Sequence, residues 1–230
     1  MNGIFASVND HVTDQTFIDT GLTEGETYFY VVDAINSASQ PSEDSNTASV
    51  ALVFKTVFAA TLDTNESGHK GDCLVQSIKG HDFADPTNPA NLANETGTLL
   101  RLSIRGSTGG ALQVDKIYVS QVAVPSAANP VPDAWDPASD LTLVASNVVL
   151  PAGTPKTLDA IAYVLDPTKD LLVAFDINNA TGSGNLRFVA ITGPVAYFRP
   201  ATAQASAPDR SSDFVPTPDQ LYLIEKIEVL

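Results

Sequence analysis

The sequence predicts an all-β protein, in which a short, incomplete β-sandwich precedes a larger antiparallel β-sandwich of the jelly-roll kind. Apolar and polar residues alternate with a period of two along most of the chain, and helical periodicity is nearly absent. The apolar runs are short, and turn-forming stretches separate them, with 14 Gly and 15 Pro among 230 residues. We therefore expect about nine strands after residue 54 and about three or four before it.

Two long strands of the larger domain are expected within residues 99–123, joined by a Gly-rich tip. In the run 99–105, the apolar residues Leu100, Leu102 and Ile104 occupy alternate positions, which is typical of a half-buried antiparallel strand. A second run alternates at Val114 and resumes one residue out of phase at Ile117. This slip predicts a β-bulge near Asp115–Lys116.

Another strand is expected at residues 171–177. Leu171, Val173 and Phe175 share one face, whereas Leu172 and Ala174 share the other. Because both faces are apolar, we predict that this strand is covered on both sides and lies in the centre of a sheet. Further strands are expected at 186–192 and 220–230.

The boundary between the two domains is expected near residues 52–57. A polar loop leads through one apolar strand directly into a second apolar run, and no Gly- or Pro-rich linker separates them. We assign residues 1–54 to the incomplete sandwich and residues 55–230 to the larger one.

The first domain contains the spacing Leu22-x-x-Gly25-x-x-Tyr28, which is typical of a known family. Residues 17–52 resemble the second half of a fibronectin type III domain, and this spacing is similar to the tyrosine corner of that family, whose Tyr hydroxyl pins the preceding loop. The other matching residues are Asp19, Thr20, Tyr30, Val32, Ala34 and Asn36, followed by residues 42–50. The resemblance implies a spacer or adhesion module without chemistry.

The resemblance covers only part of such a domain. A fibronectin-like sandwich uses about seven strands in roughly 100 residues, and here the first strands are missing. The remaining part would expose an apolar sheet face and unpaired edges, which proteins avoid. We expect it to be covered by the following domain, another copy of the chain, another protein, or an upstream segment if the chain is a fragment.

Residues 141–177 carry a second resemblance. A strand, the motif Leu150–Gly153, Asp159 and the run 170–177 together resemble modules of bacteriophage virion proteins, particularly tail- and fibre-associated ones, and residues 99–123 fit the same pattern. The resemblance implies a structural virion protein of the tail, fibre, baseplate or head decoration, assembled in the host cytoplasm. Its expected partners are other virion proteins or copies of itself in a homo-oligomer, with a host-surface glycan as a further ligand. The alternative is an extracellular carbohydrate-binding or adhesion module of a secreted bacterial protein.

Composition and isolated residues argue against several other classes. A net charge of −15 with only 12 Lys and Arg excludes nucleic-acid and anionic-membrane surfaces, and no apolar run is long enough for a membrane span. The single cysteine, Cys73, is expected to be a small buried residue. The histidines are expected to be exposed, although His69 and His81 flank acidic residues that could join them at a transition metal. With no catalytic pattern, we predict that the protein is not an enzyme.

Two sets of residues are candidate binding sites. Asp63, Asn65 and Ser67 have the spacing of a calcium loop, but Leu74 stands where that loop needs a bidentate Glu, so a polar surface loop is the alternative. Trp135 lies on a Pro-rich loop, where it could stack on a sugar ring or cap the end of the sandwich. The aromatic residues around the loop 199–219 form the other expected contact surface: Tyr197, Phe198 and Phe214.

Overall fold

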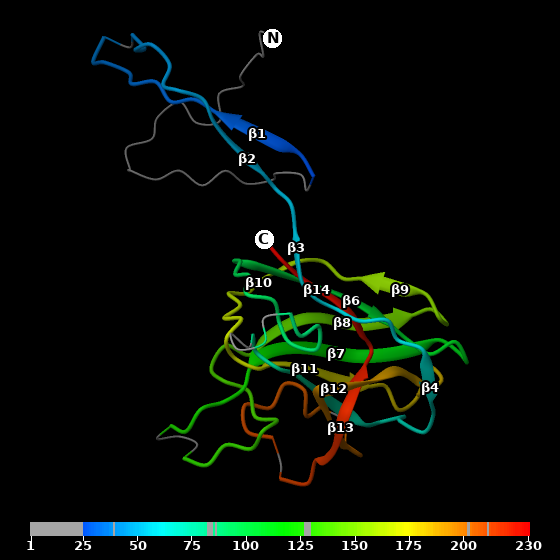
Figure 1. Cartoon of the computed structure of the whole chain (residues 1–230). Helices are drawn as coiled ribbons and strands as arrows, with labels where there is room; N and C mark the ends of the chain where they lie inside the picture. The colour runs from blue at the N-terminus through cyan, green and yellow to red at the C-terminus, as the bar shows by residue number, and fades with distance from the viewer. Residues whose placement is uncertain are drawn as a thin grey trace. The chain divides into compact units, whose positions relative to one another are not determined.

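The structure is a computed structural model that describes residues 25–230, except 39, 82–84, 86, 127–129, 202 and 211. It divides into two compact units, residues 1–54 and 55–230, which are considered separately below. All regular secondary structure of the described residues is β-structure (Figure 1), as the sequence predicts.

The described part of the first unit is one antiparallel hairpin. Strand β1 (Thr27–Tyr30) pairs with β2 (Ala48–Ala51), with Tyr28 opposite Val50. Further backbone hydrogen bonds extend the ladder at both ends, from Gly25 N to Leu52 O at 2.8 Å and from Ser45 N to Val32 O at 2.8 Å. Gly25 has a φ of 85°, a conformation that glycine tolerates best. Asp19, Thr20 and Leu22 of the fibronectin-like pattern lie outside the described residues.

The second unit contains twelve strands in its described part, more than the sequence predicts. They are β3 (Lys55–Ala59), β4 (Thr64–Glu66), β5 (Cys73–Ile78), β6 (Leu99–Arg105), β7 (Leu112–Gln121), β8 (Thr142–Leu150), β9 (Pro155–Thr157), β10 (Ile161–Ala162), β11 (Leu171–Ile177), β12 (Leu186–Arg199), β13 (Val215–Tyr222) and β14 (Ile224–Val229). Strands β4, β9 and β10 have only two or three residues each, so they are too short to show an alternating pattern in the sequence.

These strands form a sandwich of two antiparallel sheets. One has the order β10-β6-β14-β3 with β9 also beside β6, and the other has the order β13-β12-β5-β11-β7-β8 with β4 beside β12. If β9 and β10 count as one strand, and β4 and the β12–β13 hairpin are set aside, the eight strands that remain, numbered along the chain, have the orders 1-8-3-6 and 2-7-4-5. This is the strand order of a jelly roll. The β12–β13 hairpin extends the larger sheet beyond β5.

The main core lies between the two sheets. Leu100, Leu102 and Ile104 of β6 are fully buried there, which confirms the predicted inner face. Strand β11 is buried at every position and lies inside the larger sheet, as predicted. The predicted bulge is also confirmed, because Asp176 pairs with Lys116 whereas Ile177 pairs with Val114.

The predicted single run 220–230 is divided between two sheets. Strand β13 ends at Tyr222 in the larger sheet, and β14 begins at Ile224 in the smaller one. Leu223 between them has a φ of 61°, so the chain turns sharply where it crosses the sandwich. An apolar alternation continues through this crossing because both segments face the same core.

Candidate functional site

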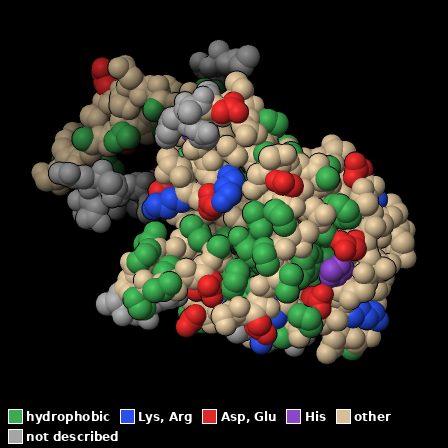
Figure 2. Space-filling model, turned by 60° about the horizontal axis from the view of Figure 1, so that its bottom comes forward, with side chains coloured by type: hydrophobic (Ala, Val, Ile, Leu, Met, Phe, Trp, Pro, Cys, Tyr) green, Lys and Arg blue, Asp and Glu red, His purple; other side chains and the backbone are tan. Residues whose placement is uncertain are grey.

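A second hydrophobic cluster lies on the outer face of the larger sheet. It combines Val75 of β5, Leu172 of β11 and Tyr197 of β12 with Phe214 from the loop before β13. The ring centroid of Trp135 lies 5.2 Å from that of Tyr197 and 5.6 Å from that of Phe214. Three of the four predicted aromatic residues therefore meet. Figure 2, which brings the β12 and β13 side forward, shows hydrophobic side chains gathered on this face.

Phe198 lies on the other side of β12. Its ring is 4.7 Å from that of His69 and 5.1 Å from that of Tyr222, and it packs against the main core. Successive side chains of a strand point to opposite faces, so Tyr197 and Phe198 cannot contribute to one surface.

The aromatic cluster is largely closed to solvent. Tyr197 is 9% exposed and Phe214 is 5% exposed, while Trp135 is partly exposed and its buried Nε1 atom has no hydrogen-bond acceptor among the described residues. These rings form a small accessory core under two loops, the one around Trp135 between β7 and β8 and the one between β12 and β13. They do not present the row of open ring faces on which sugars stack.

Arg210 holds the two loops over this accessory core. Its side chain is buried, and its guanidinium donates hydrogen bonds to three backbone carbonyls, those of Gln204 at 3.2 Å, Ala205 at 3.0 Å and Trp135. Burial lowers the pKa of Arg210 from its usual value. The sequence pattern does not reveal this role, because Arg210 lies in a polar stretch that resembles an exposed loop.

Two buried carboxylates complete the arrangement around Arg210. Oδ1 of Asp136 accepts a hydrogen bond from Arg210 N at 2.9 Å, and Oδ1 of Asp176 accepts one each from Gln204 N and Ala205 N at 3.1 Å. Burial, followed by the nearby Asp176, raises the pKa of the Cys73 thiol well above its usual value. Cys73 is buried, as predicted, and it remains a thiol that is poorly suited to nucleophilic attack.

The candidate calcium residues lie at one end of the sandwich. Thr64–Glu66 form β4, so Asn65 is part of an extended strand that pairs with β12. Oδ1 of Asn65 accepts hydrogen bonds from Thr108 N at 3.2 Å and from Arg187 Nη1 at 3.1 Å. Asp63 and Ser67 flank this strand, and Oδ1 of Asp63 accepts a hydrogen bond from the hydroxyl of Thr64 at 2.8 Å. Among the described residues, no three His, Cys, Asp or Glu side chains are grouped to hold a metal.

His69 lies beside this end and is largely buried, so the expectation of an exposed side chain is wrong here. Its Nδ1 atom is 2.9 Å from Oδ2 of Asp72, and its Nε2 atom is 3.7 Å from Oε1 of Glu66. Glu66 also accepts a hydrogen bond from the hydroxyl of Tyr222 at 2.5 Å. The ring thus tethers the loop after β4 to the core. His11 lies outside the described residues.

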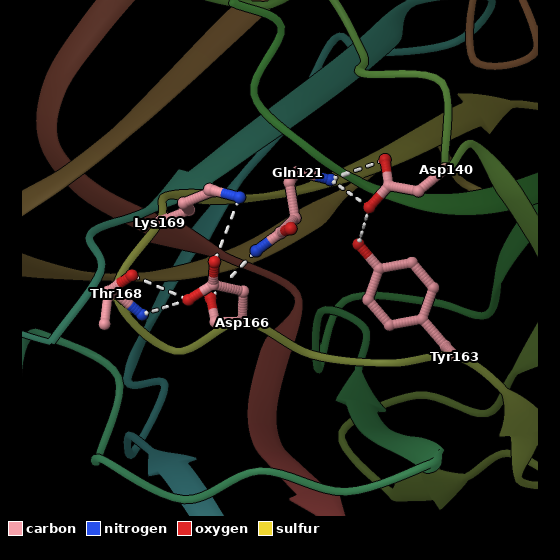
Figure 3. A network of polar contacts seen from close by, with 6 residues as sticks. All are labelled: Gln121, Asp140, Tyr163, Asp166, Thr168 and Lys169. Atoms are coloured by element: carbon pink, nitrogen blue, oxygen red, sulfur yellow. Dashed lines mark hydrogen bonds and ion pairs between the residues drawn. The ribbon is translucent and has the colours of Figure 1, made fainter.

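A polar network joins the end of β7 to the segments around Asp140 and Tyr163 (Figure 3). Both carboxylate oxygens of Asp140 accept hydrogen bonds from Gln121 N at 3.1 Å, and the Tyr163 hydroxyl donates to Asp140 at 2.7 Å. The Gln121 side chain donates to the backbone carbonyl of Asp166 at 2.8 Å. Burial and the Asp140 carboxylate raise the pKa of Tyr163. The network fixes the connection 158–170 to the end of β7, and its polar groups bind each other.

The described part of the hairpin unit differs from all these regions in its burial. None of its described residues from 25 to 54 is buried. Five large apolar side chains are exposed: Phe29, Val32, Ile35, Val50 and Val53. Residues 1–54 also contain eight Asp and Glu and no Lys or Arg, so their net charge is −8, whereas residues 55–230 carry 19 acidic and 12 basic residues, a net charge of −7.

No protein-family model matches the chain, and no curated protein sequence matches it. Within the described ranges, no helix could cross a bilayer.

Proposed function

We propose that the protein is a structural component of an assembly, most specifically of a bacteriophage virion, and that it acts through protein–protein contacts made by its N-terminal hairpin unit. The main support for this proposal is that the described residues between 25 and 54 expose five large apolar side chains and include no buried residue. A protein surface with this character marks an interaction site.

The contrast with the second unit supports this proposal. Residues 55–230 have two hydrophobic clusters and two complete sheets, so this unit can stabilise itself. An isolated two-stranded hairpin is marginally stable at best in water. The hairpin therefore gains most of its stability from whatever covers Phe29 and its neighbours.

Charge favours a different protein as the partner over a second copy of this unit. Two units of net charge −8 repel each other, and the hairpin offers no basic residue to offset this. A partner with an apolar patch bordered by Lys and Arg would complement both the exposed side chains and the acidic charge. Other virion proteins are the class of partner that the resemblance of residues 141–177 implies.

The proposal is tested by co-expressing the full chain with the products of its neighbouring genes and analysing complexes by size-exclusion chromatography with light scattering. The double variant Val32→Ser/Val50→Ser should abolish a complex that the wild type forms. The matched control Val131→Ser/Val164→Ser, which changes two exposed valines of the second unit, should leave it intact. A complex that survives the first variant, or a chain that binds none of these proteins, contradicts the proposal.

A further inference from the structure

The outer face of the smaller sheet contains an open groove of about 430 Å³ with both polar and apolar lining. It runs across strands that are far apart in the sequence, from the residues after β3 over β14 and β6 to β9. The lining residues that matter for its chemistry are Ala60, Ser103, Arg105, Thr157, Glu225 and Lys226.

Strand register explains the groove. Ser103 of β6 lies opposite both Thr157 of β9 and Lys226 of β14, so these three side chains share the outer face. The hydroxyl oxygens of Ser103 and Thr157 are 2.8 Å apart. Because these two side chains are short, they leave space beside the longer side chains of Arg105 and Lys226.

The groove lining includes two cationic side chains, Arg105 and Lys226, and one carboxylate, Glu225. Both cations form ion pairs that leave some of their N–H groups available. Nε of Arg105 is 2.6 Å from Oε1 of Glu225, and a guanidinium has four further N–H groups on its two Nη atoms. Lys226 pairs with Glu228, which does not line the groove.

We propose that this groove binds a saccharide that carries carboxylate groups, such as a polymer of uronic acids. Arg105 would bind the carboxylate, since the guanidinium matches two carboxylate oxygens at once. The hydroxyls of Ser103 and Thr157 both donate and accept hydrogen bonds, which suits the hydroxyl groups of a sugar. Glu225 would accept a hydrogen bond from a sugar hydroxyl and would disfavour a more highly charged phosphate group.

The test uses the full chain and NMR titration with trigalacturonate, with a neutral galactose trisaccharide for comparison. Saturable shifts are expected at the amides of 103, 105, 157 and 226 with the acidic sugar, and at least tenfold weaker binding with the neutral one. Arg105→Gln should weaken binding at least tenfold. Arg101→Gln is the matched control, because Arg101 lies two positions earlier on the same face and does not line the groove.

Binding of trigalacturonate that Arg105→Gln weakens and Arg101→Gln changes less than twofold establishes the site. Three results overturn it: no saturable binding, equal binding of the neutral trisaccharide, or equal losses in the two variants, since the last indicates non-specific attraction to positive charge. The hairpin contact is measured with different variants, so either proposal can fail without the other.

Discussion

The backbone N–H of Arg210 donates a hydrogen bond of 2.9 Å to Oδ1 of Asp136, a residue 74 positions earlier in the chain. The Arg210 side chain meanwhile binds carbonyls on both loops, including that of Trp135. One buried residue therefore closes the accessory core on the outer face of the larger sheet, and the Trp135 loop depends on it.

Replacing Arg210 by Met should destabilise the second unit by about 2–4 kcal/mol, because three carbonyls lose their donor in a buried setting. Urea unfolding followed by tryptophan fluorescence measures this through Trp135, the single Trp of the chain. Lys169→Met is the control, since Lys169 forms an exposed pair with Asp166 and should cost at most about 1 kcal/mol. Equal effects of the two changes would refute the role given to Arg210.

Tyr163→Phe should lower the free energy of unfolding by about 1–2 kcal/mol, because Asp140 loses the hydroxyl donor at 2.7 Å. Tyr118→Phe removes a hydroxyl from a partly buried ring at the accessory core and serves as the comparison. Thermal unfolding should rank the variants in this order. A larger loss for Tyr118→Phe would contradict the importance of the Asp140 network.

The stabilising effect of Glu228 should disappear in acid. Burial opposes its ionisation, but Lys226 and Arg101 more than offset this, so the pKa of Glu228 lies below its usual 4.5. The native state therefore binds this proton less readily than the unfolded state, and the stabilisation is present above pH 4.5 and is lost as the pH falls through the lowered value. Melting temperatures of wild type and Glu228→Gln should converge between pH 5 and pH 3. A gap that widens on acidification would reverse the sign and refute this assignment.

Gly184→Ala should cost about 1 kcal/mol or more, because Gly184 has a φ of 65° and an added Cβ would lie 2.9 Å from the backbone N of Lys70. Gly109→Ala is a suitable comparison, since its Cβ would meet side-chain atoms no closer than 3.3 Å. Chemical denaturation of both variants tests this. Equal stability of the two would show that the loops at this end rearrange freely.

Local alternation predicts much of the larger sandwich. Three features follow from period-two patterns that can each be recognised within one strand: the inner face of β6, the bulge at Asp115 and the burial of β11 on both faces. The burial of Cys73 follows from its chemistry alone.

The remaining features depend on contacts between distant segments, which alternation does not encode. The change of sheet at Leu223 is hidden because β13 and β14 both place apolar residues toward one core. The separation of Phe198 from Tyr197 could have been found, since neighbours on a strand face opposite ways. The role of Arg210 and the groove at Ser103 could be found only from the tertiary structure, because each is formed by segments that are far apart in the sequence.

The described residues of the N-terminal hairpin include no buried side chain, and we propose that a partner covers them. Hydrogen–deuterium exchange on the full chain, at a concentration where light scattering shows a monomer, measures how stable the hairpin is alone. Amides of Thr27–Tyr30 and Ala48–Ala51 should exchange at least a hundredfold faster than those of Leu171–Ile177, which lie in the buried centre of the larger sheet. Equal protection of the hairpin and the central strand in the monomer would contradict this proposal.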